Sequence, residues 1–475
     1  AYDGFNAGSY GFLNDNLQMN NLGSGTTYTA PGSEVKKWAL NSYLARVNYT
    51  VNNKYLLTAS IRADGSSRFG SDNRWGYFPS AALAWRASEE SFIKDLNIFS
   101  NLKPRVSFGI TGNQDGIGTY PAYALLGSNG YVAGGDKVTG YYPSQVANTN
   151  LKWETTAQFD AGIDFGFFNN RLTVVIDGYY KKTRDLLLKV KVPGSSGFSS
   201  GLKNIGEVEN KGFELAINAT PIEGDFTWNT SLNLTYNKNK VLDLGDVSFI
   251  YPSQPGQDET GIHLGRIIQV GQPLGTFYGY VYDGLFSTTD DIASSAQPTA
   301  KPGDIRYKDI SGPDGVPDGV INDLDRTIIG CAQPKLFGGF NNTFSYKNFD
   351  LNVNTIFTIG NDVYNGTRVT MENMQGSTNM FASTMNYWTP DNQNAPLPRP
   401  LRSKAVMRVS NQYVENGSYL RFQNIMFGYN VPTDFLRFTK YVSGLRVYAS
   451  LQNFITITSY SGDNPEVSKY GQDNL

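Results

Sequence analysis

A run of acidic, amide and glycine residues at 309–325 is the clearest candidate for metal chemistry. Calcium takes six to eight oxygen ligands, and an EF-hand-type loop supplies them from positions 1, 3, 5, 7, 9 and 12 around a glycine at position 6. With Asp318 at position 5, Gly319 falls at position 6. The predicted ligand set of a structural calcium ion is then Asp309, Ser311, Asp318, Val320 through its carbonyl, Asn322 and Asp325.

Two features of this loop leave a second interpretation open. Residues 313–317 must loop out of the motif, and Asp at position 12 binds calcium less well than the usual bidentate Glu. A start at Asp314 would instead place Val316, which has no side-chain oxygen, at position 3. Because Asp-Gly pairs are ordinary turn formers, the alternative is a solvated, turn-rich loop without metal.

Aromatic residues in the long segments between predicted strands are the candidates for ligand contact. Aromatic rings stack well on sugar rings and also serve peptide ligands. The alternative is that the rings pack the loops against one another. The predicted substrate-binding residues are Tyr131, Tyr141, Tyr142, Tyr387 and Trp388.

Residues for covalent catalysis are scarce. The chain has one His and one Cys, His263 and Cys331, which opposes a nucleophilic triad and a Cys/His zinc site. No motif places a pair of carboxylates for glycan hydrolysis. A net charge of −2 also opposes nucleic-acid binding, which needs a basic face. We therefore predict neither an enzyme nor a nucleic-acid binder.

The elements that must position these residues show a period of two. In residues 226–237, Phe226, Trp228, Leu232, Leu234 and Tyr236 alternate with small polar residues. Successive strand residues point to opposite sides, so this strand separates an apolar environment from a wet, uncharged one. Ten steps at about 3.3 Å, tilted by about 40°, project to about 25 Å, which is the height of the apolar band in outer-membrane barrels.

Similar segments recur in pairs, joined by short turns rich in Asn, Asp and Gly or by short helical caps. The connections between pairs are long, and a strict alternation of short turns and long loops is typical of outer-membrane barrels. A soluble all-β fold is the less favoured interpretation. The predicted hairpins are 42–51 with 54–63, 79–87 with 103–112, 154–167 with 171–188, 208–220 with 226–238, 336–346 with 349–360 and 418–430 with 445–458.

Composition agrees with such a barrel. Only 17% of the 475 residues are charged, against about 25% in ordinary soluble domains, and 13% are aromatic. An apolar lipid-facing side and a neutral polar lumen explain both figures. The length alone would suggest about three globular domains, but one large barrel fits as well.

Several motifs, in order, resemble the SusC/RagA-like TonB-dependent outer-membrane transporters of Bacteroidota. The longest is KYLLTASIRADGSSRFGSDNRWGYFPSAALAW at 54–85. The others are LKPRVSFGITGNQDGIG at 102–118, NKGFELAINATPI at 210–222, PGDIRYKDISG at 302–312 with DGVINDLDRTIIG at 318–330, WTPDNQNAPLPRP at 388–400, SYLRFQNIMFGYNVP at 418–432 and LRVYASLQNFITITSYSGDNPEVS at 445–468.

This resemblance implies an all-β, transmembrane antiparallel barrel of 22 strands, of which residues 1–475 supply the C-terminal portion with about 12 strands. The N-terminal plug and the final strand would lie outside the sequence. The implied function is TonB-dependent import of an oligosaccharide, or second an oligopeptide, across the bacterial outer membrane. The implied partners are a SusD-like lipoprotein lid, TonB and, as an open option, a second transporter–lid pair. No cofactor is required.

Two other functions remain as alternatives to active import. A passive porin or an adhesin-type barrel would also explain long loops on one side of the membrane. A soluble glycan-binding or glycan-cleaving β-protein ranks last because paired carboxylates are missing from the motifs.

Overall fold

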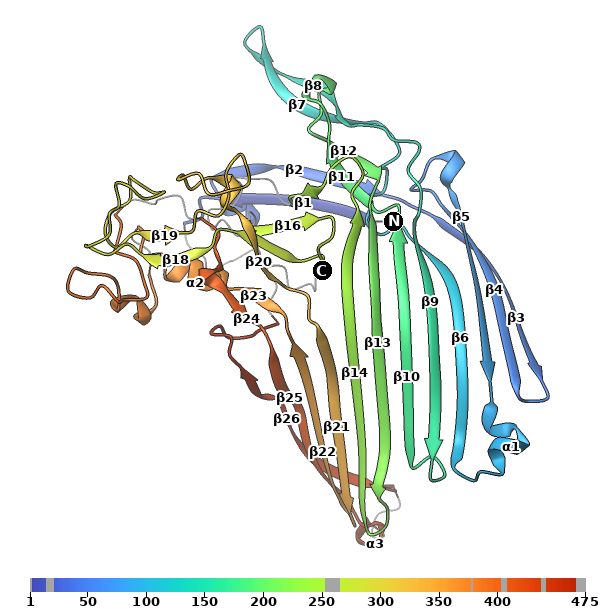
Figure 1. Ribbon diagram of the computed structural model, residues 1–475. Coiled ribbons are helices and arrows are strands. Elements are labelled where there is room, and N and C mark those ends of the chain that lie inside the picture. Colours follow the sequence, from blue (N-terminus) through green and yellow to red (C-terminus); the bar gives the residue numbers. More distant parts are fainter. Residues whose placement is uncertain are drawn as a thin grey trace.

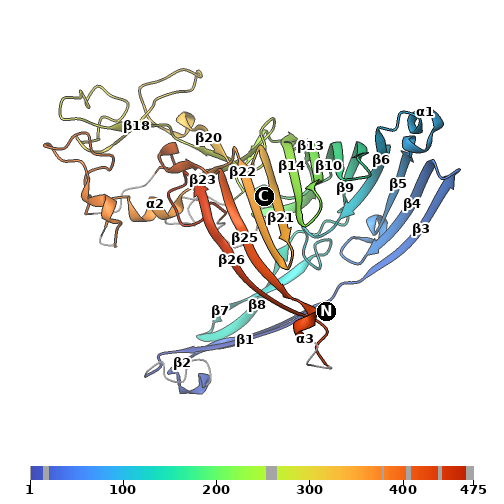
Figure 2. The same ribbon diagram turned by 90° about the horizontal axis from the view of Figure 1, so that it is seen from below.

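The computed structural model describes residues 2–13, 21–252, 265–376, 379–402, 408–436 and 441–466. Its main element is a twelve-stranded antiparallel sheet in which sequence neighbours are also spatial neighbours, in the order β26-β25-β22-β21-β14-β13-β10-β9-β6-β5-β4-β3. The sheet forms a curved wall with an open side (Figures 1 and 2). The long antiparallel β-sheet that the alternation predicted is therefore confirmed.

The six predicted hairpins all form, with ends shifted by a few residues. The strands run from 11 residues in β5 to 18 residues in β14, long enough to cross a bilayer at a tilt. Their bounds are β3 (Leu40–Val51), β4 (Tyr55–Ser66), β5 (Trp75–Trp85), β6 (Phe99–Asn113), β9 (Glu154–Phe167), β10 (Leu172–Arg184), β13 (Glu207–Ile222), β14 (Phe226–Asp243), β21 (Leu336–Tyr346), β22 (Phe349–Ile359), β25 (Tyr419–Val431) and β26 (Leu445–Thr458).

Short connections gather at one end of the wall, the lower end in Figure 1. Asn52 and Asn53 have φ angles of 50° and 57°, and Asn169 and Asn170 have 57° and 64°. Left-handed backbone of this kind is what tight hairpins require and what Asn tolerates. The short helical caps that the sequence predicted also form: α1 (Ser91–Lys94) connects β5 to β6, and α3 (Thr433–Leu436) connects β25 to β26.

The two faces of the wall differ in chemistry. Pairing places Phe108 of β6 opposite Phe159 of β9, and both rings are about half exposed. On the other face, Ser107 lies opposite Asp160. An apolar face with large exposed side chains is suited to hydrocarbon, whereas the polar face is suited to a wet lumen. No helix in the described residues is long and apolar enough to cross a membrane.

Within the part of the chain that the structure describes, the two outermost strands, β3 and β26, each pair on one side only. Unpaired backbone amides at a sheet edge are costly in lipid, because no water is available to bond them. The edges at β3 and β26 would have to be covered before this wall could lie stably in a membrane.

The long connections at the opposite end are more structured than the sequence predicted. Two long hairpins, β1 with β2 and β7 with β8, project from this end of the wall (Figure 1). The strands here are β1 (Tyr2–Tyr10), β2 (Thr27–Lys36), β7 (Leu125–Ala133), β8 (Asp136–Gln145), β11 (Leu187–Lys191), β12 (Ser200–Asn204), β15 (Phe249–Ile250), β16 (Arg266–Gln269), β17 (Thr276–Gly279), β18 (Tyr282–Leu285), β19 (Ile305–Tyr307), β20 (Thr327–Cys331), β23 (Asp362–Tyr364) and β24 (Val414–Asn416). The helices are α2 (Gly366–Met371) and short 3-10 turns at Leu22–Ser24, Ser71–Asn73, Gly194–Ser196, Asp323–Asp325, Ala382–Met385 and Asn411–Tyr413, with another at Ala87–Glu89 beside α1.

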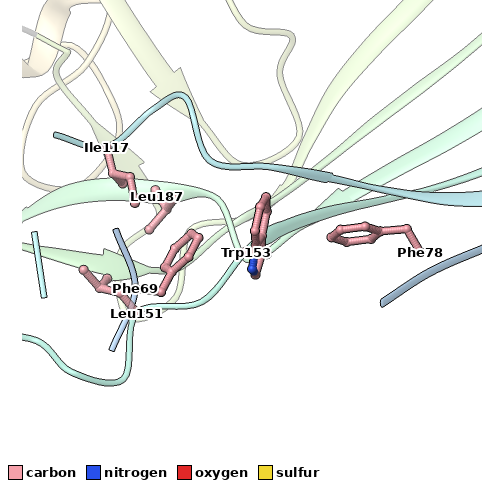
Figure 3. Close-up of a cluster of buried hydrophobic side chains, with 6 residues drawn as sticks. All are labelled: Phe69, Phe78, Ile117, Leu151, Trp153 and Leu187. Carbon is pink, nitrogen blue, oxygen red and sulfur yellow. The ribbon is translucent and has the colours of Figure 1, made fainter. Parts of the chain in front are cut away.

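A small apolar core anchors these loops to the wall. The Trp153 ring lies between Phe69 and Phe78, with ring centroids 5.1 and 5.5 Å away. Leu151, Ile117 and Leu187 complete the cluster (Figure 3). Trp153 also donates from its indole nitrogen to the Arg74 carbonyl at 3.1 Å. Loops that follow β4, β6 and β10 and the loop that leads into β9 are thus held together by burial, which stabilises their position over the wall.

Candidate functional site

The polar face of the wall carries an ion network across three strands. Arg105 of β6 donates to Asp164 of β9 at 3.1 Å and to Asp177 of β10 at 2.7 Å. Lys103 forms a second ion pair with Asp164 at 2.6 Å. Gly162 lies beneath the Arg105 side chain, and a Cβ there would lie 2.1 Å from the Asp177 carboxylate. The glycine therefore leaves room for the guanidinium to span β9.

Farther along the same face, uncharged amides replace the ions. A hollow of about 680 Å³ lies over β13, β14, β21, β22 and β25. Amide side chains can both donate and accept hydrogen bonds, so such a surface binds hydroxyl-rich or peptide groups without strong charge. The amides that line this hollow are Asn218, Asn233, Asn341, Asn354 and Gln423.

The acidic loop is organised around Asp325, which is fully buried. Its carboxylate accepts from the backbone N–H groups of Asn322 at 2.8 Å, Ile310 at 2.9 Å and Ser311 at 3.2 Å. Burial by itself would raise the pKa of Asp325, but these hydrogen bonds outweigh it and lower the pKa below its ordinary value. Asp325 is thus a charged anchor that closes the loop on itself.

The other predicted ligands are also partly engaged. Asp309 accepts from Gly319 N–H at 2.6 Å through one oxygen, and its other oxygen is buried with no hydrogen-bond partner in the described residues. Asp318 accepts from Val320 N–H at 3.0 Å, and Asn322 from Leu324 N–H at 2.8 Å. Within the described ranges, no group of three His, Cys, Asp or Glu residues is placed to share a metal ion. The loop brings Asp309 next to Asp325, but calcium binding stays a prediction.

The predicted substrate-binding aromatics fall into two separate groups. Tyr131 on β7 and Tyr141 and Tyr142 on β8 lie on one hairpin, 54%, 74% and 50% exposed. Tyr387 and Trp388 lie between α2 and β24, in a different part of the loops. Figures 1 and 2 both show the β7–β8 hairpin apart from α2. The structure therefore does not form one aromatic site from all five residues.

Trp388 is buried rather than presented to a ligand. Its backbone N–H donates to the Leu397 carbonyl at 2.9 Å, and its side chain is 6% exposed. Gly303 has a φ angle of +88°, and a Cβ there would lie 2.5 Å from the Trp388 ring. Both the backbone and the close ring require glycine at position 303. Trp388 thus packs two loops together.

Three polar clusters in the outer loops carry no signal in the sequence alone. Arg368 of α2 pairs with Glu372 and Glu415, both at 2.8 Å. Arg421 of β25 pairs with Glu466. Arg408 stacks over the Tyr280 and Tyr307 rings, with its guanidinium carbon 4.8 and 5.6 Å from their centroids. Apart from Glu372, which lies one helical turn after Arg368, the partners are far apart in sequence, so only the fold brings them together.

The lone thiol shows no sign of activation. Burial raises the pKa of Cys331, which disfavours the thiolate that a nucleophile requires. His263 lies outside the described residues.

The long strands, short turns at one end, apolar outer face and polar inner face together define the wall of an outer-membrane β-barrel. Comparison with known proteins agrees. The sequence model of the family "TonB dependent receptor-like, beta-barrel" matches residues 1–454. The chain belongs to this family and is an outer-membrane protein.

Individual relatives place it more narrowly. TonB-dependent receptor P3 of Formosa agariphila is 39% identical over 99% of this chain and 46% of its own length. TonB-dependent receptor SusC of Bacteroides thetaiotaomicron is 36% identical over 90% of this chain and 41% of its own length. The RagAB peptide transporter structure superposes with a TM-score of 0.80 at 29% identity, over 96% of this chain and 48% of that chain. The resemblance to SusC/RagA-like proteins is confirmed, and the chain spans about half the length of these relatives.

Proposed function

We propose that this chain is the C-terminal portion of a TonB-dependent transporter that imports a large nutrient across the bacterial outer membrane. The observation that carries the proposal is the twelve-stranded wall, in a chain of which 96% superposes on the RagAB structure. Import by such a barrel needs binding and a shift between conformational populations, but no covalent chemistry. We accordingly propose that the protein is not an enzyme.

The cargo that we propose is an oligosaccharide, with an oligopeptide second. The amide-lined hollow on the polar face and the exposed tyrosines of the β7–β8 hairpin support a neutral, hydroxyl-rich ligand. The similarity to SusC supports the same choice by family, whereas the similarity to a peptide transporter supports the second.

The partners that we propose follow from the family. A SusD-like surface lipoprotein would close over the loop end of the barrel, and TonB would act through an N-terminal region that precedes the twelve-stranded wall. A plug inside a 22-strand barrel and a dimer of transporter–lid pairs complete the proposed assembly. The two open sheet edges at β3 and β26 support the need for further strands.

Growth on defined cargo tests the choice of ligand. Cells that carry the full-length receptor as their only transporter of this class are given oligosaccharides or oligopeptides as the limiting nutrient. We expect receptor-dependent growth on an oligosaccharide, and weaker growth when Tyr141 and Tyr142 are both replaced by Ala. Tyr10→Ala on the β1–β2 hairpin, where the side chain is 60% exposed, is the matched control. Receptor-dependent growth on oligopeptides but not on oligosaccharides would contradict the first choice and support an oligopeptide as the cargo.

A further inference from the structure

A second hollow, remote from the polar face of the wall, lies inside the outer loops. It measures about 480 Å³ and is lined by segments that are far apart in the sequence, including 296–300, 304–307, 373–375 and 398–401, together with Arg408. That volume is in the range of small-molecule sites and is large enough for a single sugar-sized unit. Among the lining residues are Gln297, Thr299, Asp304, Asn373, Arg399 and Arg408.

Arg408 is the unusual residue of this cavity. It lies over the rings of Tyr280 and Tyr307, and its Nη2 donates to the Ile321 carbonyl at 3.2 Å. Its Nη1 is buried and has no hydrogen-bond partner among the described residues. A shielded guanidinium that lacks a full set of acceptors costs free energy, which the ring contacts offset only in part.

The nearby carboxylates are already committed elsewhere. Asp304 pairs with Arg399 at 2.7 Å and also accepts from Lys301 N–H at 2.9 Å. Asp323 accepts from the Tyr280 hydroxyl at 3.1 Å. Among the described residues, the charged side chains that line the cavity are two cations, Arg399 and Arg408, and one anion, Asp304, so this part of the lining carries one uncompensated positive charge.

We propose that this cavity binds an anionic group, a carboxylate or a sulfate ester on a sugar-sized unit, with Arg408 as its charge partner. The anion would supply the acceptor that the guanidinium lacks, and a charged hydrogen bond of this kind is among the strong ones. An acidic sugar and the terminal carboxylate of a peptide share this chemistry. The site would exist whether the barrel imports actively or acts as a passive pore.

Calorimetric titration of the full-length receptor in detergent tests this proposal. The probes are D-glucuronate, N-acetylglycine and neutral D-glucose. We expect glucuronate to bind at least about tenfold more tightly than glucose, and high salt to weaken its binding. N-acetylglycine tells the two sources apart: tighter binding than glucuronate assigns the site to peptide carboxylates, and weaker binding assigns it to acidic sugars. Equal affinity for glucose and glucuronate would overturn the proposal.

Substitutions localise the binding to Arg408. Arg408→Gln is expected to reduce glucuronate affinity about tenfold or more, to the level of glucose, while Arg408→Lys retains part of it. The exposed Arg402 provides the matched control, since Arg402→Gln removes an equal charge outside the cavity. Unchanged glucuronate binding in Arg408→Gln would contradict the assignment. If Arg408→Gln unfolds, two other measurements test the assignment: weaker glucuronate binding by Arg408→Lys than by the wild type, and weaker binding by the wild type in high salt. The absence of both effects would contradict it.

Discussion

The guanidinium of Arg105 reaches across an entire strand to the carboxylate of Asp177, 2.7 Å away. The two residues lie on β6 and β10, and β9 lies between them. Gly162 of β9 makes this possible because it has no side chain to block the path. One ion pair on the polar face therefore ties together three neighbouring strands of the wall.

Replacing Gly162 with a larger residue is expected to disrupt the ion pair between Arg105 and Asp177. In Gly162→Val the new side chain would displace both Arg105 and Asp177, and we expect a loss of about 1–3 kcal/mol in stability. Thermal unfolding of the detergent-solubilised receptor measures the effect. Gly178→Val on β10 is the matched control, because a Cβ there meets nothing nearer than 4.0 Å. Equal losses in the two variants would show that the gap over β9 has no special role.

The assignment of the two faces predicts opposite responses to a new charge. Phe108→Arg would place a cation on the apolar face, at a cost of about 2–4 kcal/mol near the bilayer midplane. Ser107→Arg, one residue earlier, would place the same charge on the polar face beside Asp160, and we expect a much smaller effect. The yield of heat-modifiable folded receptor in outer membranes measures both. A greater loss of folded receptor from Ser107→Arg than from Phe108→Arg would show that the lipid-facing and lumen-facing sides are assigned the wrong way round.

The sequence predicted the wall well because both of its signals are local. Alternation along β14 and left-handed turn residues such as Asn52 and Asn53 depend on neighbours only. The outer loops were harder. Residues 27–36 form β2 although they contain Pro31 and Gly32, because pairing with β1 decides their conformation.

Site residues could be predicted from the sequence only where their spacing along the chain matches a known ligand pattern. The acidic loop was found from its EF-hand-type pattern, and the structure brings Asp309 and Asp325 together. The charged residues near the end of β4 have different partners: Asp64 pairs with Arg62, while Arg68 donates to the backbone carbonyl of Gln114. Such choices of partner depend on how loops fold over one another, which no local pattern records.

Acid is expected to loosen the loop around Asp325. Because the folded-state pKa of this Asp lies below its ordinary value, its stabilising contribution is fully present above about pH 5 and is lost as the pH falls through about 4 and below. Hydrogen exchange of residues 309–326, corrected for intrinsic rates, should rise over this range. Asp325→Asn should exchange faster already at pH 7 and depend less on pH. Exposed Asp314→Asn is the control, and identical exchange in the two variants would contradict this role of Asp325.

Calcium binding at 309–325 can be tested separately. The unpartnered buried oxygen of Asp309 is the atom best placed to contact a cation, since oxygen ligands are what calcium prefers. We expect titration of the metal-free receptor with calcium chloride to release or absorb heat at one site, and Asp309→Ala to abolish this binding while Asp314→Ala preserves it. A titration of the wild type without heat of binding would contradict calcium binding and favour a turn-rich loop without metal.

The proposal that this wall belongs to an energised importer can be tested by one measurement of uptake into whole cells. Accumulation of a labelled oligosaccharide is followed in cells that express the full-length receptor, with and without TonB. We expect uptake against a concentration gradient to stop when TonB is absent, while binding of the oligosaccharide at the cell surface persists. Equal uptake in both strains would contradict active import and favour a passive pore.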